Sequence, residues 1–171
     1  MKLTPRSGKK TIALLGGFCL FLATLEYLIP KPLPFMRIGL ANAPLLLALD
    51  RLSFRHFALL ALIKIMGQAI ITGTLFSYVF LFSLTGTCAS AVFMYLIRRM
   101  LGVHRISFIG VSVMGALLSN GTQLALAYCF VFGAGMQYLV PPFLAAGITT
   151  SIALGVFCEA FAARSRWYQQ A

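Results

Sequence analysis

Residues 106–158 read ISFIGVSVMGALLSNGTQLALAYCFVFGAGMQYLVPPFLAAGITTSIALGVFC, a run of 53 residues without Asp, Glu, Lys or Arg. As one helix this run would be about 80 Å long, whereas a bilayer core of about 30 Å takes about 20 apolar residues per crossing. The run therefore predicts two membrane crossings joined by a turn. The glycines of residues 132–137 (FGAGMQ) place that turn near the middle.

The composition of the whole chain agrees with this. Hydrophobic residues make up 60% of the 171 residues and charged residues only 10%, which leaves too little polar surface to coat a soluble globule. The loops between the apolar segments are too short to form a soluble catalytic domain. We expect an integral membrane protein whose residues 1–171 form a single transmembrane domain.

Six apolar segments are predicted to form the helices of an all-α, polytopic bundle. The first segment follows Lys9 and Lys10 and is stopped at Pro30, because the fixed φ of proline breaks a helix. A cleavable signal peptide is the alternative for this segment, although no small-residue cleavage site precedes the prolines. The predicted spans are about 11–29, 33–49, 54–72, 75–97, 106–132 and 138–163.

The second segment is short for a crossing, because only 12 residues separate Arg37 from Asp50. Cytoplasmic loops are rich in Lys and Arg, so the distribution of charge tests whether this segment crosses. Six crossings from a cytoplasmic N-terminus put eleven basic residues inside and two outside, whereas five crossings put four inside and nine outside. The sequence therefore predicts six transmembrane helices with the N- and C-termini in the cytoplasm.

The formal net charge of +11 follows from this topology and from contact with anionic membrane lipid. A nucleic-acid partner is not expected, because the basic residues are divided among short loops. A metal site is not expected either, because thiolate sites need clustered ligands. The four cysteines instead occur singly, as packing residues of the apolar segments: Cys19, Cys88, Cys129 and Cys158.

The chemical content of the chain lies in polar side chains within the apolar segments, where such groups are costly and usually face the interior of a bundle. Lys64, Gln68 and Thr72 share one face of the third predicted helix, and Asn120 and Gln123 share one face of the fifth. We expect a polar pocket that opens outward, with these substrate-binding residues: Glu26, Arg37, Asn42, Lys64, Gln68, Asn120 and Gln123.

The alternative is that these groups only hold the bundle together, through interhelical hydrogen bonds and an ion pair of Glu26 with Arg37 or Lys64. Lys64 favours a pocket, because a mid-membrane ammonium carries a desolvation cost of several kcal/mol and reaches the surface with difficulty. A pocket with Lys64 and Arg37 suits a ligand that carries an anionic group. No catalytic residue and no cofactor are expected.

Small residues recur along one face of the first, fifth and sixth predicted helices, a pattern that allows close helix approach. They include Ala13 and Gly17 on the first helix, Ser112, Gly115, Ser119 and Thr122 on the fifth, and Gly147, Ser151 and Gly155 on the sixth. Packing within the bundle is the ordinary interpretation. The other interpretation is a docking surface for a partner, with these residues: Ala13, Gly17 and Glu159.

Residues 37–44 (RIGLANAP) follow a proline-rich turn that Glu26 precedes, and the third predicted helix carries Lys64. In these features, and in residues 107–123, the chain resembles the Gx transporter family, long labelled component I of heptaprenyl diphosphate synthase. That family is similar to the substrate-binding S components of energy-coupling factor transporters.

The resemblance implies a six-helix protein of the bacterial cytoplasmic (inner) membrane that holds a small vitamin-like ligand near the outer face. It also implies two kinds of partner. One is a transmembrane coupling protein, contacted by the first helix through a face that Ala13 and Gly17 match loosely, and the other is a set of cytoplasmic ATPases.

An independent prenyl diphosphate synthase is not expected. Such enzymes bind Mg²⁺ and diphosphate through aspartate-rich motifs, because a hard cation needs clustered carboxylates. The chain has three acidic residues in total, and Glu26, Asp50 and Glu159 are far apart. It also lacks the sequence G-x-x-x-x-G-K-[ST], so any nucleotide-driven step would belong to a partner.

Two functions stay open. The first is capture of a small, anionic or vitamin-like molecule from outside for uptake driven by a partner ATPase, with residues 30–34 as a candidate lid. The second is a non-catalytic membrane subunit associated with prenyl diphosphate or quinone biosynthesis, or with flavin-linked extracellular electron transfer. A self-associating channel is a weaker third function, because no helix repeats a polar stripe along its full length.

Overall fold

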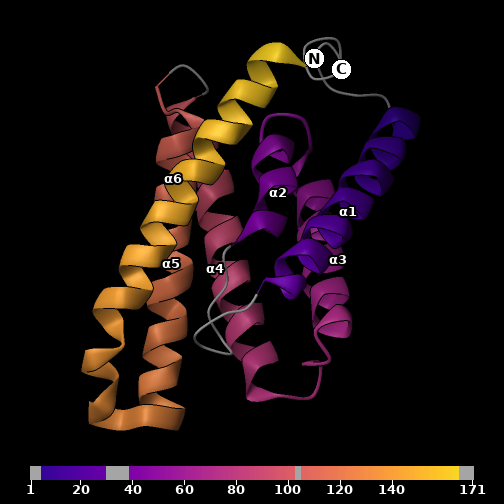
Figure 1. The fold of residues 1–171 in the computed structure, drawn as a ribbon. Coiled ribbons are helices and arrows are strands. Elements are labelled where there is room, and N and C mark those ends of the chain that lie inside the picture. The colour runs from indigo at the N-terminus through magenta and orange to yellow at the C-terminus, as the bar shows by residue number, and fades with distance from the viewer. Residues whose placement is uncertain (1–4, 30–38, 103–104, 166–171) are drawn as a thin grey trace.

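The computed structural model describes residues 5–29, 39–102 and 105–165, and Figure 1 shows them as a bundle of helices. This part of the chain is 87% helix and contains no strand. It contains six α-helices and three short segments, η1 to η3, of 3₁₀ or π type. In chain order they are α1 (Pro5–Leu28), η1 (Leu40–Asn42), α2 (Ala43–Ala48), α3 (Phe54–Ile71), α4 (Tyr78–Leu101), α5 (Phe108–Ala127), η2 (Tyr128–Phe132), η3 (Gly133–Tyr138) and α6 (Val140–Arg164).

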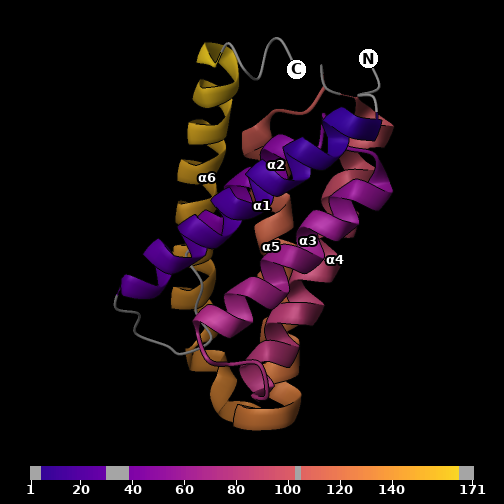
Figure 2. The ribbon, with the colours of Figure 1, turned by 90° about the vertical axis from the view of Figure 1, so that its right-hand side faces the viewer.

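Five of these helices, all except α2, are long and apolar enough to cross a membrane. Successive helices run in opposite directions, so α1 begins and α6 ends at the upper end of Figure 1. The turn from α3 to α4 and the turn from α5 to α6 both lie at the lower end. Figure 2 shows that α1 and α3 both run obliquely, side by side, while α6 stands upright beside them.

The helix ends follow from the local sequence. The side-chain oxygens of Ser77 and Ser107 accept hydrogen bonds from the first turns of α4 and α5, at 3.3 and 3.2 Å, as preferred N-cap residues do. α4 ends at Gly102, whose φ of 78° favours glycine. Prolines occupy the first turn of α6, where the missing N–H has no partner to lose.

Most predicted spans correspond to helices whose ends differ. α1 begins at Pro5 and α4 continues to Leu101, because both helices extend past the apolar window into charged residues. α5 is α-helical only to Ala127, and the turn predicted at residues 132–137 lies within η2 and η3.

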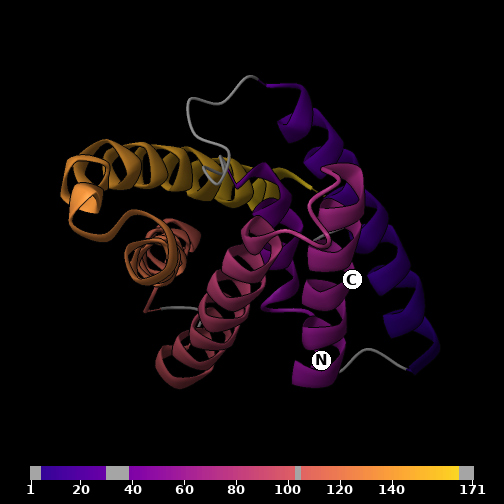
Figure 3. The same cartoon turned by 90° about the horizontal axis from the view of Figure 1, so that it is seen from below.

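The predicted second span, residues 33–49, is described only from residue 39 onward. That part holds only η1 and α2, and the six residues of α2 rise about 9 Å along the helix axis. Residues 33–38 lie outside the described residues. Every residue of α2 is buried, and seen from below α2 lies between α6 and the pair α1 and α3 (Figure 3).

Two cysteines hold this short helix. Cys19 on α1 donates a hydrogen bond to the carbonyl oxygen of Ala41 at 3.6 Å, and Cys158 on α6 donates one to the carbonyl oxygen of Ala43 at 3.7 Å. Both thiols are fully buried. Cysteine packs as a small apolar side chain with a weak S–H donor, so these two residues both fill space and fix the start of α2.

An ion pair between a buried arginine and an aspartate lies at the upper end of the bundle. The guanidinium of Arg98 donates two hydrogen bonds of 2.8 Å to the carboxylate of Asp50. It also donates to the carbonyl oxygen of Ile106 and lies 4.6 Å from the centre of the Phe108 ring. Arg98 belongs to the last turn of α4 and is only 5% exposed. The pair ties the segment after α2 to α4 and α5.

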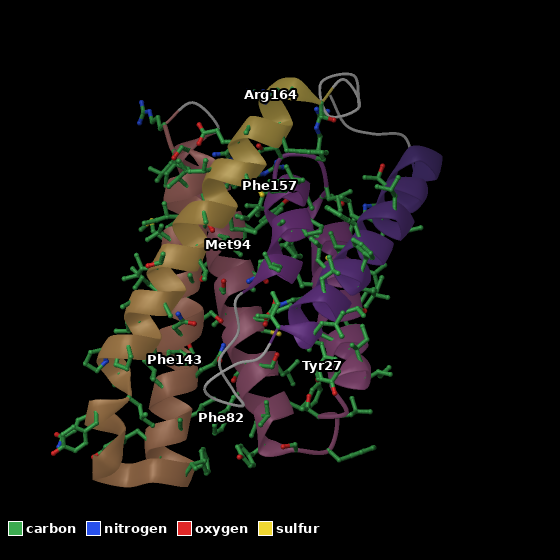
Figure 4. The ribbon with its side chains drawn as sticks, viewed as in Figure 1. Tyr27, Phe82, Met94, Phe143, Phe157 and Arg164 are labelled. Carbon is green, nitrogen blue, oxygen red and sulfur yellow. The ribbon has the colours of Figure 1, made fainter. Side chains whose placement is uncertain are left out.

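The interior consists of two apolar clusters. The larger one joins α1, α2, α3 and α4 with the upper parts of α5 and α6. The smaller one lies lower, between α4, α5 and α6, and contains Phe82 and Phe143, which Figure 4 labels below Met94 of the larger cluster. Along each of these three helices, small and polar residues separate the two clusters. The bundle therefore contains a polar layer between two apolar ones.

Candidate polar binding cavity

The polar layer encloses a cavity of about 50 Å³. A space of this size holds about four water molecules. Six of the seven substrate-binding residues predicted from the sequence line it: Glu26, Asn42, Lys64, Gln68, Asn120 and Gln123. The seventh, Arg37, lies outside the described residues, as does the candidate lid of residues 30–34. The structure thus brings together side chains from α1, η1, α3 and α5, and their role toward a ligand stays a prediction.

Thr72, which shares a face with Lys64 and Gln68 in the sequence, is not among the lining residues. It lies just beyond the end of α3, and its hydroxyl donates a 2.8 Å hydrogen bond to the carbonyl oxygen of Gln68. This bond satisfies the hydroxyl within its own helix.

Six hydroxyl side chains complete the lining, and none of them was predicted: Thr87, Ser90, Ser112, Ser119, Thr150 and Ser151. Ser and Thr are frequent in membrane helices, so their polarity alone does not mark a cavity. The available signal is their spacing, because Ser112, Ser119 and Gln123 fall on the same face of α5.

The cavity contains buried side chains of both charge types. Glu26 is 0% and Lys64 only 3% exposed. The N–H of Gly39 donates a 3.1 Å hydrogen bond to Oε2 of Glu26, and the φ of 86° at Gly39 is one that glycine adopts readily. The turn before η1 therefore fixes the carboxylate at the wall of the cavity. Ionisable groups inside a membrane bundle are costly and typically mark a functional site.

Gln68 has an unused hydrogen-bonding atom. Its Oε1 is buried and accepts no hydrogen bond from the part of the chain that the structure describes. An unpaired buried acceptor costs about 1–3 kcal/mol. Because Gln68 lines the cavity, this oxygen is available to a donor that enters the cavity.

Two glycines make room for the amides of α5. A Cβ at Gly86 would lie 2.9 Å from Nε2 of Gln123, and a Cβ at Gly147 would overlap the amide of Asn120. Gln123 also donates a 3.0 Å hydrogen bond to Oγ of Ser119. The amides of α5 thus reach the backbones of α4 and α6 and close the polar layer on both sides.

The lining offers hydrogen-bond donors, acceptors and one ionisable group of each sign, which suits binding of a polar molecule. Within the described ranges, no group of three or more His, Cys, Asp or Glu side chains could hold a metal ion.

Residues 15–161 match the family described as heptaprenyl diphosphate synthase component I. The chain belongs to this family. The matched component I segment includes every residue that lines the cavity. Neither the curated proteins nor the solved structures provide a match.

The small-residue stripe on α6 of this component I chain packs inside the bundle. A Cβ at Gly155 would lie 2.5 Å from Cα of Ile109 on α5, and Gly147 and Ser151 are buried. This agrees with the packing interpretation of the stripe. The predicted docking residues Ala13, Gly17 and Glu159 are all exposed, and their role in docking stays a prediction.

Proposed function

We propose that this component I chain is the substrate-binding membrane component of a transporter of the energy-coupling-factor type. It captures a small, anionic or vitamin-like molecule from outside, and a partner ATPase drives uptake. The chain performs no covalent chemistry itself. The observation that carries the proposal is a polar cavity within a bundle of apolar helices, in which the buried Oε1 of Gln68 accepts no hydrogen bond from the described residues.

The side chains of the cavity have separate roles in this proposal. Lys64 holds an anionic group of the ligand, together with Arg37, which lies outside the described residues. Asn42, Gln68, Asn120 and Gln123 supply orienting hydrogen bonds. Glu26 either neutralises one of the cations or binds a cationic part of the ligand.

The partners follow from the surface and from the resemblance to S components. The exposed face of α1 around Ala13 and Gly17 would contact a transmembrane coupling protein, and Glu159 on α6 would meet a basic group of a partner. Nothing lies within 4 Å of the position of a Cβ at Gly17, so a second helix has room to approach there. The protein would lie in the bacterial cytoplasmic membrane.

The family description, heptaprenyl diphosphate synthase component I, supports a second candidate, a non-catalytic membrane subunit of a prenyl diphosphate synthase. A subunit associated with quinone biosynthesis or flavin-linked extracellular electron transfer is a further form of this candidate. The three acidic residues have separate places: Glu26 is at the cavity, Asp50 is paired with Arg98, and Glu159 is exposed. They do not form the carboxylate cluster that Mg²⁺ and diphosphate require. In this role the chain would act through a catalytic partner.

Native mass spectrometry of the gently solubilised protein, expressed in its own host, tests the proposal. We expect a bound small molecule in the wild type that is lost in Lys64→Ala, because the variant removes the cation of the cavity. Met66→Ala is the matched control, since Met66 lies on the same helix but is 38% exposed. Both variants should retain the helical content and the melting temperature of a folded bundle.

Wild-type retention of the molecule in Lys64→Ala would remove Lys64 from the site. An empty bundle that carries a prenyltransferase or a redox protein would favour the second candidate, with Lys64 as a structural residue.

A further inference from the structure

An apolar groove of about 360 Å³ lies next to the polar cavity. One wall is a stripe of α6 formed by Thr150, Ala153, Leu154 and Phe157, whose spacing of three, four and seven residues places them on one helix face. Leu22 of α1 forms the opposite wall and Ala43 of α2 the floor. Figure 1 shows α2 between α1 and α6, where these two helices diverge.

The side chains that line the groove are almost all apolar. Thr150 is the one polar side chain among its described lining residues, and its hydroxyl already donates to the carbonyl oxygens of Ala146 at 3.0 Å and Gly147 at 3.1 Å. Phe157 at the rim is 51% exposed, whereas Ala43 on the floor is 1% exposed. The groove therefore leads from the lipid-facing surface to the buried centre of the bundle.

The groove and the polar cavity share a wall. Thr150 and Leu154 line both, so the two spaces are neighbours, with these two side chains between them. The cavity, at about 50 Å³, is far smaller than the groove, at about 360 Å³. Ligand sites usually have volumes of about 300–1,000 Å³, a range that the groove reaches and the cavity does not.

We propose that the ligand is a single-chain amphiphile. Its compact polar head occupies the cavity, where the head meets Lys64 and the unpaired oxygen of Gln68. Its hydrocarbon chain lies in the groove between α1 and α6 and emerges into lipid past Phe157, which Figure 4 labels on α6. This inference rests on the ligand-binding role proposed above for the cavity and narrows its substrate class.

A hydrocarbon chain suits the groove by its chemistry. The described lining is apolar apart from Thr150, whose hydroxyl already donates within its own helix, so the groove offers nothing to a polar occupant. Each buried methylene contributes about 0.8 kcal/mol when it leaves water.

The test uses three probes and the purified protein in phosphatidylcholine nanodiscs, with bound species counted by native mass spectrometry. The probes are farnesyl phosphate, farnesol, which lacks the phosphate, and inorganic phosphate, which lacks the chain. Because linking two groups that bind side by side raises affinity by about 10²–10⁴, we expect farnesyl phosphate to bind at least about 100-fold more tightly than either part.

A variant that blocks the groove tests the role of the groove separately from that of the cavity. Ala153→Trp places an indole at the exposed rim of the groove, and we expect it to lower the affinity for farnesyl phosphate at least about 10-fold while phosphate binding is unchanged. Ala145→Trp, also at an exposed position on α6 but outside the groove, should leave both unchanged.

Phosphate binding that depends on Lys64, with no gain from the farnesyl chain, would overturn this inference and leave the proposed cavity standing. The absence of binding by both phosphate and farnesyl phosphate would overturn the inference together with an anionic ligand for the cavity. A two-chain phospholipid that Ala153→Trp displaces, with no farnesyl phosphate bound, would show that the groove only seats bulk lipid and would likewise overturn it.

Discussion

At the scale of single residues, Gln68 is a position where we expect a substitution to weaken ligand binding without lowering the stability of the fold. Gln68→Leu replaces an amide whose oxygen has no described partner with an apolar group of similar size. We expect the free energy of unfolding to stay constant or to rise by up to about 1 kcal/mol, because no satisfied acceptor is lost. Ligand affinity should fall at least about 10-fold. Thermal unfolding and ligand binding measured on the same preparation check both expectations.

Gln137→Leu is the matched control for Gln68, since Gln137 is exposed in η3 and lies outside the cavity. A loss of more than about 2 kcal/mol in Gln68→Leu would contradict the expectation and show that the amide is a structural partner.

Asp50 and Arg98 differ from Gln68, because they contact each other within the protein. We therefore expect a substitution here to change stability. Asp50→Ala leaves the guanidinium of Arg98, which is 5% exposed, without its carboxylate, and we expect a loss of about 3 kcal/mol in unfolding free energy. Denaturant unfolding in detergent measures this loss. Arg99→Ala, at the neighbouring exposed position, is the control. Equal stability of Asp50→Ala and Arg99→Ala would show that the pair contributes nothing, whereas Arg98→Met added to Asp50→Ala should restore part of the loss.

At the scale of helices, two glycines of the small-residue stripes have different environments. Gly155→Leu inserts a side chain where a Cβ already meets the backbone of α5, whereas Gly17→Leu inserts one where nothing lies within 4 Å. We expect Gly155→Leu to separate α5 from α6 and to lower the yield and melting temperature strongly. Gly17→Leu should keep both and weaken association with a coupling protein. Size-exclusion profiles and co-purification distinguish these outcomes, and normal folding of Gly155→Leu would contradict the α5–α6 contact.

α2 shows what charge and hydropathy cannot predict from the sequence. A half-length helix and a full crossing end on the same side of the membrane, so all later loops lie on the same sides in both cases. The count of basic residues on each side therefore indicates the direction in which residues 33–49 run, but not how far they extend through the membrane. The long apolar runs of α3 to α6 were predictable because a bilayer sets their length. The length of α2 depends on contacts with α1 and α6, which the local sequence does not contain.

The charged and amide residues of the site could be predicted from the sequence because burying a polar side chain in a membrane is costly. Charged and amide side chains have few stable places in a bundle other than its interior, which explains why six predicted residues line one cavity. The hydroxyls escaped prediction because a hydroxyl can bond to its own helix, as Thr150 does. The pairing of Asp50 with Arg98 links positions 48 residues apart and leaves no local pattern.

At the scale of the whole molecule, the described turns at the two ends of the bundle differ in charge. Arg51, Arg105 and Arg164 belong to the end of the bundle where α1 begins, whereas the turns of residues 72–77 and 128–139 carry no charged residue. By the positive-inside rule we expect the basic end to face the cytoplasm. Phe76→Cys should react with a membrane-impermeant maleimide on intact cells, and Arg105→Cys only after permeabilisation. The parent chain gives the background from its own exposed cysteines, and the reverse pattern would invert the topology.

The enclosure of α2 also bears on how the chain is made. Its six residues are too few to partition into a bilayer as an independent span, and the thiol that holds the carbonyl of Ala43 belongs to Cys158, 115 positions later. During synthesis α2 lacks its contact with α6 until α6 has left the ribosome. The surroundings of α2 are therefore completed by α6, and a nascent chain stalled before α6 would expose part of α2 to the quality-control proteases of the membrane.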